Sequence, residues 1–578
     1  MRRTKIYSCP VKGSGPLALF NRRKLSLLSV LLAGALACGS SSSSLPGSTT
    51  TVAVSGVSLD QSALSLAAGV ATGTLTVMVS PANATNKNVS WSISDATVAM
   101  VTNGVVTPVG AGVATITVTT LDGAKTATCA VSVAAAPGPQ LIAIGSLDGA
   151  TDLSGLTGTL ENGDPENVLG SLGSGMAWAG GNTFLNVPDR GPNAVAYDAS
   201  IDDTTAYIGR FHTVQMALTP NPGPGLRYLL TPTLTKTTLL SSTDSLHYGT
   251  GSSQSLMDVL DLNATNGVNY FTGRSDGYGS GDSGNPLNSR LDPEAIRVSN
   301  DGESIFISDE YGPDVYQFDR ATGRRIRSFA LPSGFYVANE SPVGADEISG
   351  NTSGRVSNKG MEGLAITPDG ATLVGFMQSA LIQDGGNKAK VDRIVTIDIA
   401  SGVTHQYAYN NRIGGASYNI SEIVAINNHE FLVDERDGNG LGGGSGATVK
   451  QLYKIDLAGA ADVSAIAGED TLLTYAVDKT LFLDIRAVLN AAGIADTEIP
   501  SKIEGVAFGS DMVINGIIKH TLWVANDNDF VPADAGTNKF FVFAVSDADL
   551  GESVFVSQAL TPRPAISVAV TGVIVNQP

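Results

Sequence analysis

The chain has 578 residues, which is more than one hydrophobic core usually serves, so we expect two or more domains. Its 66 glycines and its low content of charged residues, 15%, are typical of an all-β protein with many turns. A formal net charge of −19 argues against nucleic acid and anionic membrane surfaces as partners, and it suits an exported protein that gathers divalent cations.

Residues 1–38 have the pattern of an export signal, in which Arg22, Arg23 and Lys24 precede an apolar run that ends at Cys38. That run is too short for a stable transmembrane helix. Ala35-Leu-Ala-Cys38 resembles a bacterial lipoprotein cleavage site, although Ala35 stands where Leu is usual. The resemblance implies a lipidated Cys38, a Ser-rich tether over 39–51 and a place in the cell envelope, at the outer membrane or the cell surface. Ordinary signal-peptidase cleavage nearby is the alternative, and it also predicts export.

Residues 52–134 carry short strand-like runs separated by turn signals, which predicts a β-sandwich. The Pro81-Ala-Asn-Ala-Thr-Asn turn before Trp91 and the Gly104-Val-Val-Thr-Pro-Val segment resemble the bacterial immunoglobulin-like group 2 domain. The resemblance implies a spacer or adhesive module, in which we expect Trp91 to be a core residue.

The stretch RLDPEAIRVSNDGESIFISDE, residues 290–310, organises the rest of the chain. It predicts a strand, a tight turn at Asn300-Asp301-Gly302 and a second strand that ends in acidic residues. The start of one strand and the end of its antiparallel partner are neighbours in a hairpin. The acidic residues at both points are therefore expected to share one rim.

Similar units begin near residues 174, 212, 294, 362, 422 and 504, although the second lacks the acidic signature. Six repeated units of small antiparallel sheets predict a six-bladed β-propeller over residues 140–560, with seven blades as the alternative. A helix is predicted near Leu481–Ala492, where the apolar spacing becomes helical. Residues 561–578 are expected to form a closing strand or a tail.

In a propeller the equivalent strand starts converge on the central channel, and this places carboxylates close together. Two like charges ~4 Å apart repel by about 4 kcal/mol at an effective dielectric near 20, so they must be protonated, paired with cations or bound to metal. Oxygen ligands favour Ca²⁺, with Mg²⁺ or another divalent cation as the alternative. The predicted catalytic residues are Glu294, Glu362, Glu422 and Glu504. The predicted metal ligands are Asp189, Asp292, Asp309, Glu310, Asp434, Glu435, Asp527 and Asp529. The predicted substrate-binding residues, which lie beside these acids in the sequence, are Arg190, Arg290, Lys359, Arg436 and Lys502.

The ordered motifs DPEAI…SDE, KGMEGLAITPDG, DRIVTIDIASG, SEIVAI…LVDERDGNG and KIEGVAF…VANDNDF resemble the family described as the esterase-like activity of phytase. The resemblance covers roughly residues 160–545. It implies a phosphoesterase or phytase-like role on a small phosphorylated substrate.

These observations predict an exported, metal-dependent phosphoesterase. A metal would have to bridge the carboxylates and the anionic ester, polarise the phosphoryl oxygens and lower the pKa of an attacking water. Two alternatives remain open: a propeller lactonase or carboxylesterase, and a non-enzymatic surface protein that binds a ligand or another cell and holds only structural calcium. The sequence has no zinc-ligand spacing of histidines and no phosphate-binding P-loop.

Overall fold

The computed structural model describes residues 51–561, except 68–71, 135–137, 195–203, 249–263, 266, 274–282 and 515–516. The predicted signal segment with Cys38, nearly all of the predicted tether and residues 562–578 lie outside the described residues. Within the part that is described, no helix has both the length and the apolar character needed to cross a membrane.

Residues 53–134 form the predicted β-sandwich. One sheet has the order β2 (Ala63–Ala67), β9 (Thr126–Ala134), β8 (Gly112–Thr120), β5 (Val89–Ile93), and the other has β3 (Gly73–Thr74), β7 (Val105–Pro108), β6 (Ala99–Thr102). Strand β1 (Gly56–Leu59) pairs separately with β4 (Val77–Ser80). Buried and exposed residues alternate along β9, so Cys129, Val131 and Val133 face the core, while Trp91 is half-buried against it.

The remaining strands build five larger antiparallel sheets. Their strands, in spatial order, are β11 (Gly175–Trp178), β12 (Thr183–Val187), β13 (Arg210–Pro220), β14 (Tyr228–Leu239); β18 (Pro293–Val298), β19 (Ser304–Asp309), β20 (Val315–Asp319), β21 (Arg325–Phe329); β22 (Met361–Ile366), β23 (Thr372–Met377), β24 (Val391–Asp398), β25 (Thr404–Asn410); β28 (Asn419–Ala425), β29 (Glu430–Arg436), β30 (Lys450–Asp456), β31 (Lys479–Asp484); and β32 (Lys502–Phe508), β34 (Ile517–Asp527), β35 (Asn538–Val545), β10 (Gln140–Leu147). Strand β33 (Met512–Ile514) pairs with β34 beside the last sheet.

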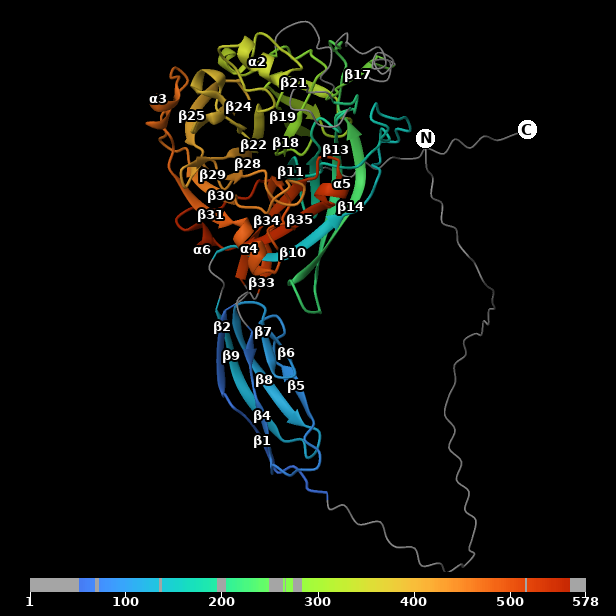
Figure 1. The fold of residues 1–578 in the computed structure, drawn as a ribbon, viewed down its shortest axis with the longest axis vertical. Helices are drawn as coiled ribbons and strands as arrows, with labels where there is room; N and C mark the ends of the chain where they lie inside the picture. Colours follow the sequence, from blue (N-terminus) through green and yellow to red (C-terminus); the bar gives the residue numbers. More distant parts are fainter. Residues whose placement is uncertain are drawn as a thin grey trace, which may run out of the picture. The chain divides into compact units, whose positions relative to one another are not determined.

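The innermost strands of these sheets form a closed ring. Strand β11 contacts β18, β18 contacts β22, β22 contacts β28, β28 contacts β32, and β32 contacts β11 again. In Figure 1, β22 and β28 lie inside this unit, and the outer strands β25, β31 and β14 lie toward its edge. The unit is therefore a β-propeller. Its last blade is completed by β10, so strands from the two ends of the domain share one sheet and close the ring.

The predicted number of blades, six, is corrected to five in the described residues. The interval from Ser174 to Glu294 contains the unit predicted near His212, which lacks the acidic signature and was inferred from strand content alone. His212 instead lies in β13, an 11-residue strand that pairs with the 12-residue β14 as the outer hairpin of the first blade. The rest of the interval contains a small sheet of β15 (Ser241–Ser242), β17 (Val268–Tyr270) and β16 (Ala264–Thr265).

Short elements occupy the loops. They are α2 (Gly344–Gly350), α3 (Glu469–Leu473), α4 (Ile485–Ala491), α5 (Pro532–Ala535), α6 (Asp547–Leu550), the 3₁₀ turns η2 (Ser333–Phe335), η3 (Ile382–Asp384) and η4 (Gly386–Lys388), and the pair β26 (Arg412–Ile413) and β27 (Ala416–Ser417). The predicted helix near 481–492 is confirmed from Ile485 onward. It starts there because residues up to Asp484 pair with β30 and the Asp484 side chain caps the helix, accepting a hydrogen bond from the Ala487 N–H at 2.8 Å.

One guanidinium group, that of Arg297, lies where the five inner strands converge. It donates to the carbonyls of Met176 (2.6 Å), Ile296 (2.7 Å), Ile423 (2.9 Å) and Val506 (3.4 Å), which occupy equivalent places in four blades. Its charge is balanced by Glu422, 2.9 Å away, and both side chains are buried. Because carbonyl oxygens from several strands point into the channel without a strand partner there, a single multi-donor cation satisfies them together.

We expect Arg297→Met to lower the free energy of unfolding by about 3–5 kcal/mol, because it leaves the Glu422 carboxylate buried without its counter-charge. Urea unfolding followed by circular dichroism would measure the loss. The double variant Arg297→Met with Glu422→Gln should recover part of it. Arg327→Met, which removes a guanidinium on the exposed strand β21, should cost less than about 1 kcal/mol. Equal losses for the two arginines would contradict the axial role.

Candidate functional site

Polar side chains gather at the mouth of the channel where the inner strands begin. In four blades the pairing register shifts there, between Pro293 and Ile296, Met361 and Gly363, Ile420 and Glu422, and Ile503 and Gly505. Such bulges re-aim a side chain and are common beside active sites. The residues at the shifts are Glu294, Glu362, Ser421 and Glu504, and Ser174 stands directly before β11 in the remaining blade.

Asp292, Glu294 and Glu310 meet at one side of the mouth. One oxygen of each lies within 4.8 Å of one oxygen of the others, and all three side chains are buried. Arg190 neutralises Asp292, with Nη1 2.9 Å from Oδ2, and its Nη1 is also 3.9 Å from Glu310. Among the described residues Glu294 has no hydrogen bond or ion pair. Burial, and next the neighbouring Glu362, raise the pKa of Glu294 well above its ordinary value.

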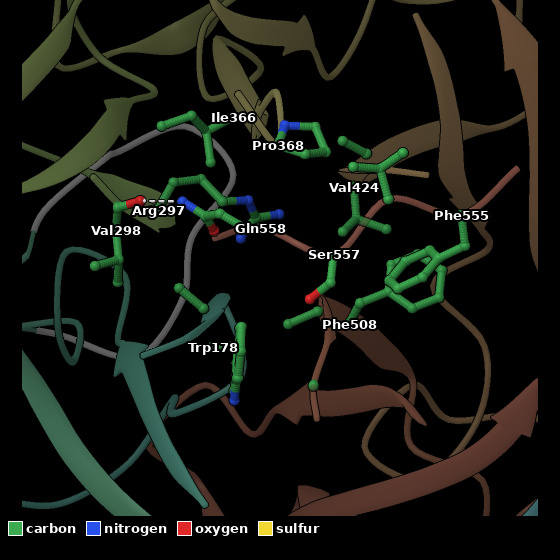
Figure 2. A pocket seen from close by; sticks show the side chains of 15 residues that line it. Trp178, Arg297, Val298, Ile366, Pro368, Val424, Phe508, Phe555, Ser557 and Gln558 are labelled. Carbon is green, nitrogen blue, oxygen red and sulfur yellow. Dashed lines mark hydrogen bonds between the residues drawn. The ribbon is translucent and has the colours of Figure 1, made fainter. Parts of the chain in front are cut away.

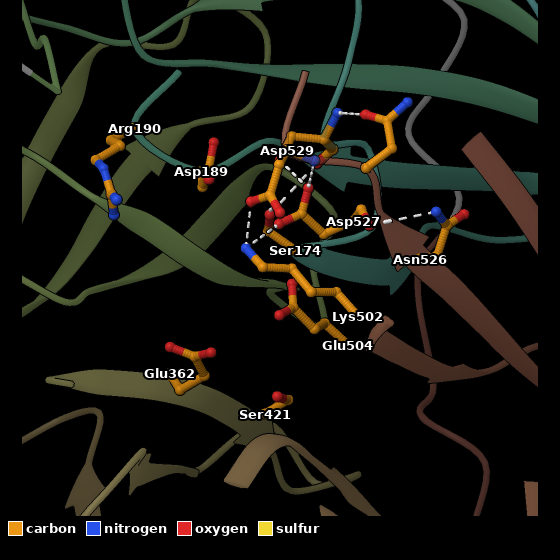
Figure 3. A network of polar contacts seen from close by, with 12 residues as sticks. Ser174, Asp189, Arg190, Glu362, Ser421, Lys502, Glu504, Asn526, Asp527 and Asp529 are labelled. Carbon is orange, nitrogen blue, oxygen red and sulfur yellow. Dashed lines mark hydrogen bonds and ion pairs between the residues drawn. The ribbon is translucent and has the colours of Figure 1, made fainter. Parts of the chain in front are cut away.

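A second acidic group, Asp189, Asp527 and Asp529, lies across the same mouth. Figure 3 shows the Lys502 ammonium group reaching both Asp527 and Asp529. The Lys502–Asp527 distance is 2.8 Å, and the Ser171 hydroxyl also donates to Asp527. Burial opposes ionisation of Asp527, but Lys502 outweighs it and lowers the pKa of this carboxyl. The Lys502 ammonium group therefore already neutralises Asp527 and Asp529, which a metal ion would otherwise have to do.

Glu362 and Lys359 belong to one blade and are joined by the Gln378 side chain. The Gln378 amide nitrogen donates to Glu362 Oε1 at 2.6 Å, and its oxygen accepts from Lys359 Nζ at 3.0 Å. Glu362 Oε2 is buried and has no hydrogen-bond partner among the described residues. Burial, together with the nearby Glu504 carboxylate, raises the pKa of Glu362 to about 8, so Glu362 is largely protonated at neutral pH.

Glu504 is held by a cation from the next blade. Arg436 donates through Nη2 to Glu504 and through Nε to the Ser421 hydroxyl, the latter at 2.8 Å. Burial raises the pKa of Glu504 to about 7, although Arg436 acts in the opposite direction. Arg436 is thus engaged within the protein and less available for substrate.

Glu422 was predicted to be a catalytic residue of this rim, and the structure corrects that prediction. The bulge places Ser421 at the mouth, and Glu422, one residue later, turns toward the axis. There it binds Arg297 and accepts hydrogen bonds from the backbone N–H groups of Leu364 (3.0 Å) and Ile423 (2.9 Å). The equivalent places in the other blades hold Gly or Ala, because the inner strands approach closely: a Cβ on Gly175 would lie 2.7 Å from the Ala295 Cα.

Four further predicted site residues have structural surroundings. Both oxygens of Asp309 accept backbone N–H groups, from Asp292 and Tyr311 on one side and Gly312 on the other. Glu435 accepts from Tyr409 and Lys479, which belong to the outer strands of two blades. Asp434 is buried opposite Glu422 in the β28–β29 register, and the Arg290 guanidinium lies 3.3 Å from the Tyr311 ring centre. Asp309 thus binds the backbone of Asp292, a member of the first acidic group, and neither Asp434 oxygen has a hydrogen-bond partner among the described residues; none of the four belongs to the two acidic groups.

Two residues at the centre of this arrangement were not predicted from the sequence, Arg297 and Gln378. The repeat alignment contains a signal for both. Arg297 stands where the other units have Ala177, Ala365, Val424 and Ala507, and Gln378 stands where they have Asp189, Glu310, Arg436 and Asp527. At the first position only Arg297 is charged, and at the second only Gln378 is neutral.

Among the described residues a pocket lies where the inner strands end, away from the bulges at their starts; Figure 2 shows its lining side chains. It is lined by the ends of the inner strands, including Trp178 and Phe508, and by the C-terminal segment that carries Phe555 and Gln558. Gln558 donates to the Val298 carbonyl at 2.7 Å. No Asp or Glu lines this pocket and Arg297 lies at its inner end, so it is separate from the acidic mouth.

The first acidic group fits a hard divalent cation. Asp292, Glu294 and Glu310 offer oxygen ligands only, which is the donor type that Ca²⁺, Mg²⁺ and Mn²⁺ prefer. Glu294 has no cationic partner, and the pKa of Glu310 is raised well above its ordinary value by burial and by Glu362. A bound cation would relieve this repulsion.

Comparison with known proteins gives two family matches. The family model described as esterase-like activity of phytase matches residues 168–530, and the model described as bacterial Ig-like domain (group 2) matches residues 53–131. A protein of Arthroderma benhamiae described as an uncharacterized secreted protein is 30% identical over 304 residues, which is 46% of this chain and 55% of the relative. The chain thus matches little more than half the length of that relative.

Solved structures with a similar course of the chain include two bacterial proteins. The PQQ-bound aldose sugar dehydrogenase of Streptomyces coelicolor is 13% identical, with 79% of this chain and 99% of that chain covered and a TM-score of 0.26. The periplasmic gluconolactonase of Pseudomonas aeruginosa is 10% identical, with 74% and 98% covered and a TM-score of 0.25. These scores are too low to carry an argument, and the fold assignment rests on the strand pairing described above.

The Glu362 carboxyl predicts a pH dependence of stability in metal-free buffer. Its ordinary pKa is 4.5 and its pKa in the folded protein is about 8, so the folded state binds more protons between these values. The free energy of unfolding should therefore fall as the pH rises through this window. Urea midpoints measured in the presence of a chelator should fall less steeply for Glu362→Gln than for the wild type. Glu303→Gln, an exposed acid in the opposite turn of the β18–β19 hairpin, should keep the wild-type slope; equal slopes for all three proteins would contradict the assignment.

Proposed function

The chain belongs to the family described as esterase-like activity of phytase, and from this premise we propose that it hydrolyses phosphate esters at the acidic mouth of its propeller. We propose that Asp292, Glu294 and Glu310 hold a divalent cation there, with Ca²⁺ as the first candidate. The observation that carries the proposal is the convergence of these three buried carboxylates around Glu294, which has no partner of its own among the described residues. The family membership supports the coarser statement, a hydrolase on a propeller.

The charges of the mouth explain why a cation is needed. A phosphate ester is anionic, and the bare carboxylates would repel it. When bound, a divalent cation supplies Lewis acidity toward a phosphoryl oxygen and lowers the pKa of a coordinated water. The Arg190 guanidinium holds Asp292 in place at 2.9 Å, which orients one of the proposed ligands.

The remaining groups at the mouth suit binding and proton transfer. Lys359 can donate to an anionic phosphoryl oxygen. Glu362 has a pKa of about 8 and therefore carries a proton at neutral pH that it can deliver to a leaving oxygen. Arg436 and Lys502, both predicted to bind substrate, are occupied by Glu504 and by Asp527 with Asp529, so we assign them the role of holding these carboxylates.

We also propose that the protein is exported and anchored through lipidated Cys38, with the immunoglobulin-like sandwich as a spacer. The residue pattern before Cys38 supports this, and so does the group 2 domain match. The matched fungal protein is described as secreted.

Glu294→Gln is expected to lower kcat/KM for phosphate release at least about 100-fold, because it removes a charged ligand from the proposed cation site. Phytate and an aryl phosphate would serve as substrates, and removing the cation with a chelator should abolish the same activity, with recovery on adding Ca²⁺. Glu303→Gln is the matched control and should keep wild-type activity. Unfolding midpoints of both variants would show whether the fold survives.

The same assay, with a lactone added as a substrate, distinguishes phosphate-ester hydrolysis from the two alternative functions. A lactone cleaved faster than either phosphate ester would favour a lactonase. Absence of any hydrolysis, combined with a Ca²⁺-dependent unfolding midpoint, would favour a structural cation in a ligand-binding protein. Phosphate release that is unaffected by Glu294→Gln in a folded protein would contradict the proposed site.

Lipidation can be tested by expressing the protein in bacterial cells that process lipoproteins. We expect the wild-type protein in the membrane fraction and Cys38→Ser in the soluble or secreted fraction, because a single thiol carries the lipid. A cysteine variant that remains in the membrane fraction would contradict the anchor, and export of both proteins would still agree with a cleaved signal.

A further inference from the structure

Four basic side chains lie at the mouth, and they differ in whether an acidic side chain of the protein pairs with them. Arg190 pairs with Asp292, Arg436 with Glu504, and Lys502 with both Asp527 and Asp529. Lys359 is half-buried, and among the described residues its ammonium group has no ion pair and a single hydrogen bond, to the neutral Gln378 amide at 3.0 Å. Of these four cations, Lys359 alone retains an unpaired charge.

Gln378 is the reason for this. The register of the blades places Gln378 in the same position as Asp189, Glu310, Arg436 and Asp527, one per blade, and all of those residues are charged. A carboxylate in place of Gln378 would lie at hydrogen-bond distance from Lys359 Nζ and would neutralise it. The amide instead orients the ammonium group without cancelling its charge, and its nitrogen anchors Glu362 Oε1 at 2.6 Å.

We propose that Lys359 is the anion-binding residue of this site, specific for the oxyanion of a phosphoryl group, and that Gln378 is a positioning residue that keeps the Lys359 charge unpaired and beside Glu362. This inference deepens the proposed function and rests on it for the identity of the anion. The acidic groups around the mouth would exclude free anions, so the single unpaired ammonium group determines where an anionic oxygen can be held.

The test uses inorganic phosphate as the probe with the full-length protein in Ca²⁺-containing buffer. Phosphate binding is measured by calorimetry and by competition against aryl phosphate hydrolysis. Gln378→Glu is nearly identical in size and should weaken phosphate binding about tenfold or more, because it supplies Lys359 with an internal counter-charge. Lys359→Met should weaken binding to a similar extent. The double variant should be no weaker than either single variant, since both changes act through the same ammonium group.

Two further variants separate this role from a general loss of structure. Gln378→Leu removes the hydrogen bonds without adding charge. It should keep phosphate binding within about threefold and change the pH profile of kcat, because Glu362 loses its hydrogen-bond donor. Gln317→Glu, the same substitution on β20 (Val315–Asp319), should leave phosphate binding unchanged.

Wild-type phosphate affinity in folded Gln378→Glu or Lys359→Met would overturn the inference. If Gln378→Glu fails to fold, Lys359→Met decides the question alone. The outcome is distinguishable from failure of the proposed function: phosphate binding that depends on Lys359 in a protein that hydrolyses no ester would sustain this inference and refute the hydrolase. Ester hydrolysis that is unchanged by both Gln378→Glu and Lys359→Met would sustain the hydrolase and refute this inference.

Discussion

The convergence of five inner strands on one axis is the constraint on which this structure depends. Carbonyl groups within these strands point into a channel where no strand can satisfy them, and an unsatisfied buried carbonyl is costly. Arg297 meets this requirement for four of the equivalent positions with one side chain, and Glu422 balances its charge and binds the backbone of the blade that contains Leu364. This axial ion pair divides the channel into an acidic mouth on one side and, on the other, a pocket that no Asp or Glu lines.

The acidic mouth follows from the same geometry. Bulges at the strand starts turn three glutamates toward one another, and the ends of the second strands, or the residues just after them, add Asp189, Glu310 and Asp527. Burial and mutual repulsion raise the pKa of several of these carboxyls, and the protein relieves the repulsion with its own cations where it can. Where no cation pairs with an acid, at Glu294, the arrangement favours an added divalent ion, and where a cation has no ion pair among the described residues, at Lys359, it favours an added anion.

The repeats of the sequence predicted much of this arrangement because a hairpin is a local structure. Alternating apolar residues, a tight turn and acids at both ends were sufficient to place Glu294 beside Glu310 on one rim, and the structure places both there. The same reasoning misjudged Glu422, because it aligned Glu422 with the other three glutamates. The bulge occurs in all four blades, and in β28 its rim position is Ser421, so Glu422 lies one residue later and is directed to the axis. The blade number was also misjudged, because the long outer hairpin of the first blade, β13 with β14, has as much strand-forming sequence as a separate blade would have.

The sequence by itself determined the all-β class, the two families that it matches and the residue types at the mouth, because these depend on composition, local periodicity and motif order. Only the tertiary structure decided which carboxylates meet, which cations are already paired, and that Arg297 and Gln378 matter. The physical reason is that these properties depend on distances between blades far apart in the chain. Charge compensation is decided by those distances, and a shift of one residue in register is enough to exchange a binding group for a structural one.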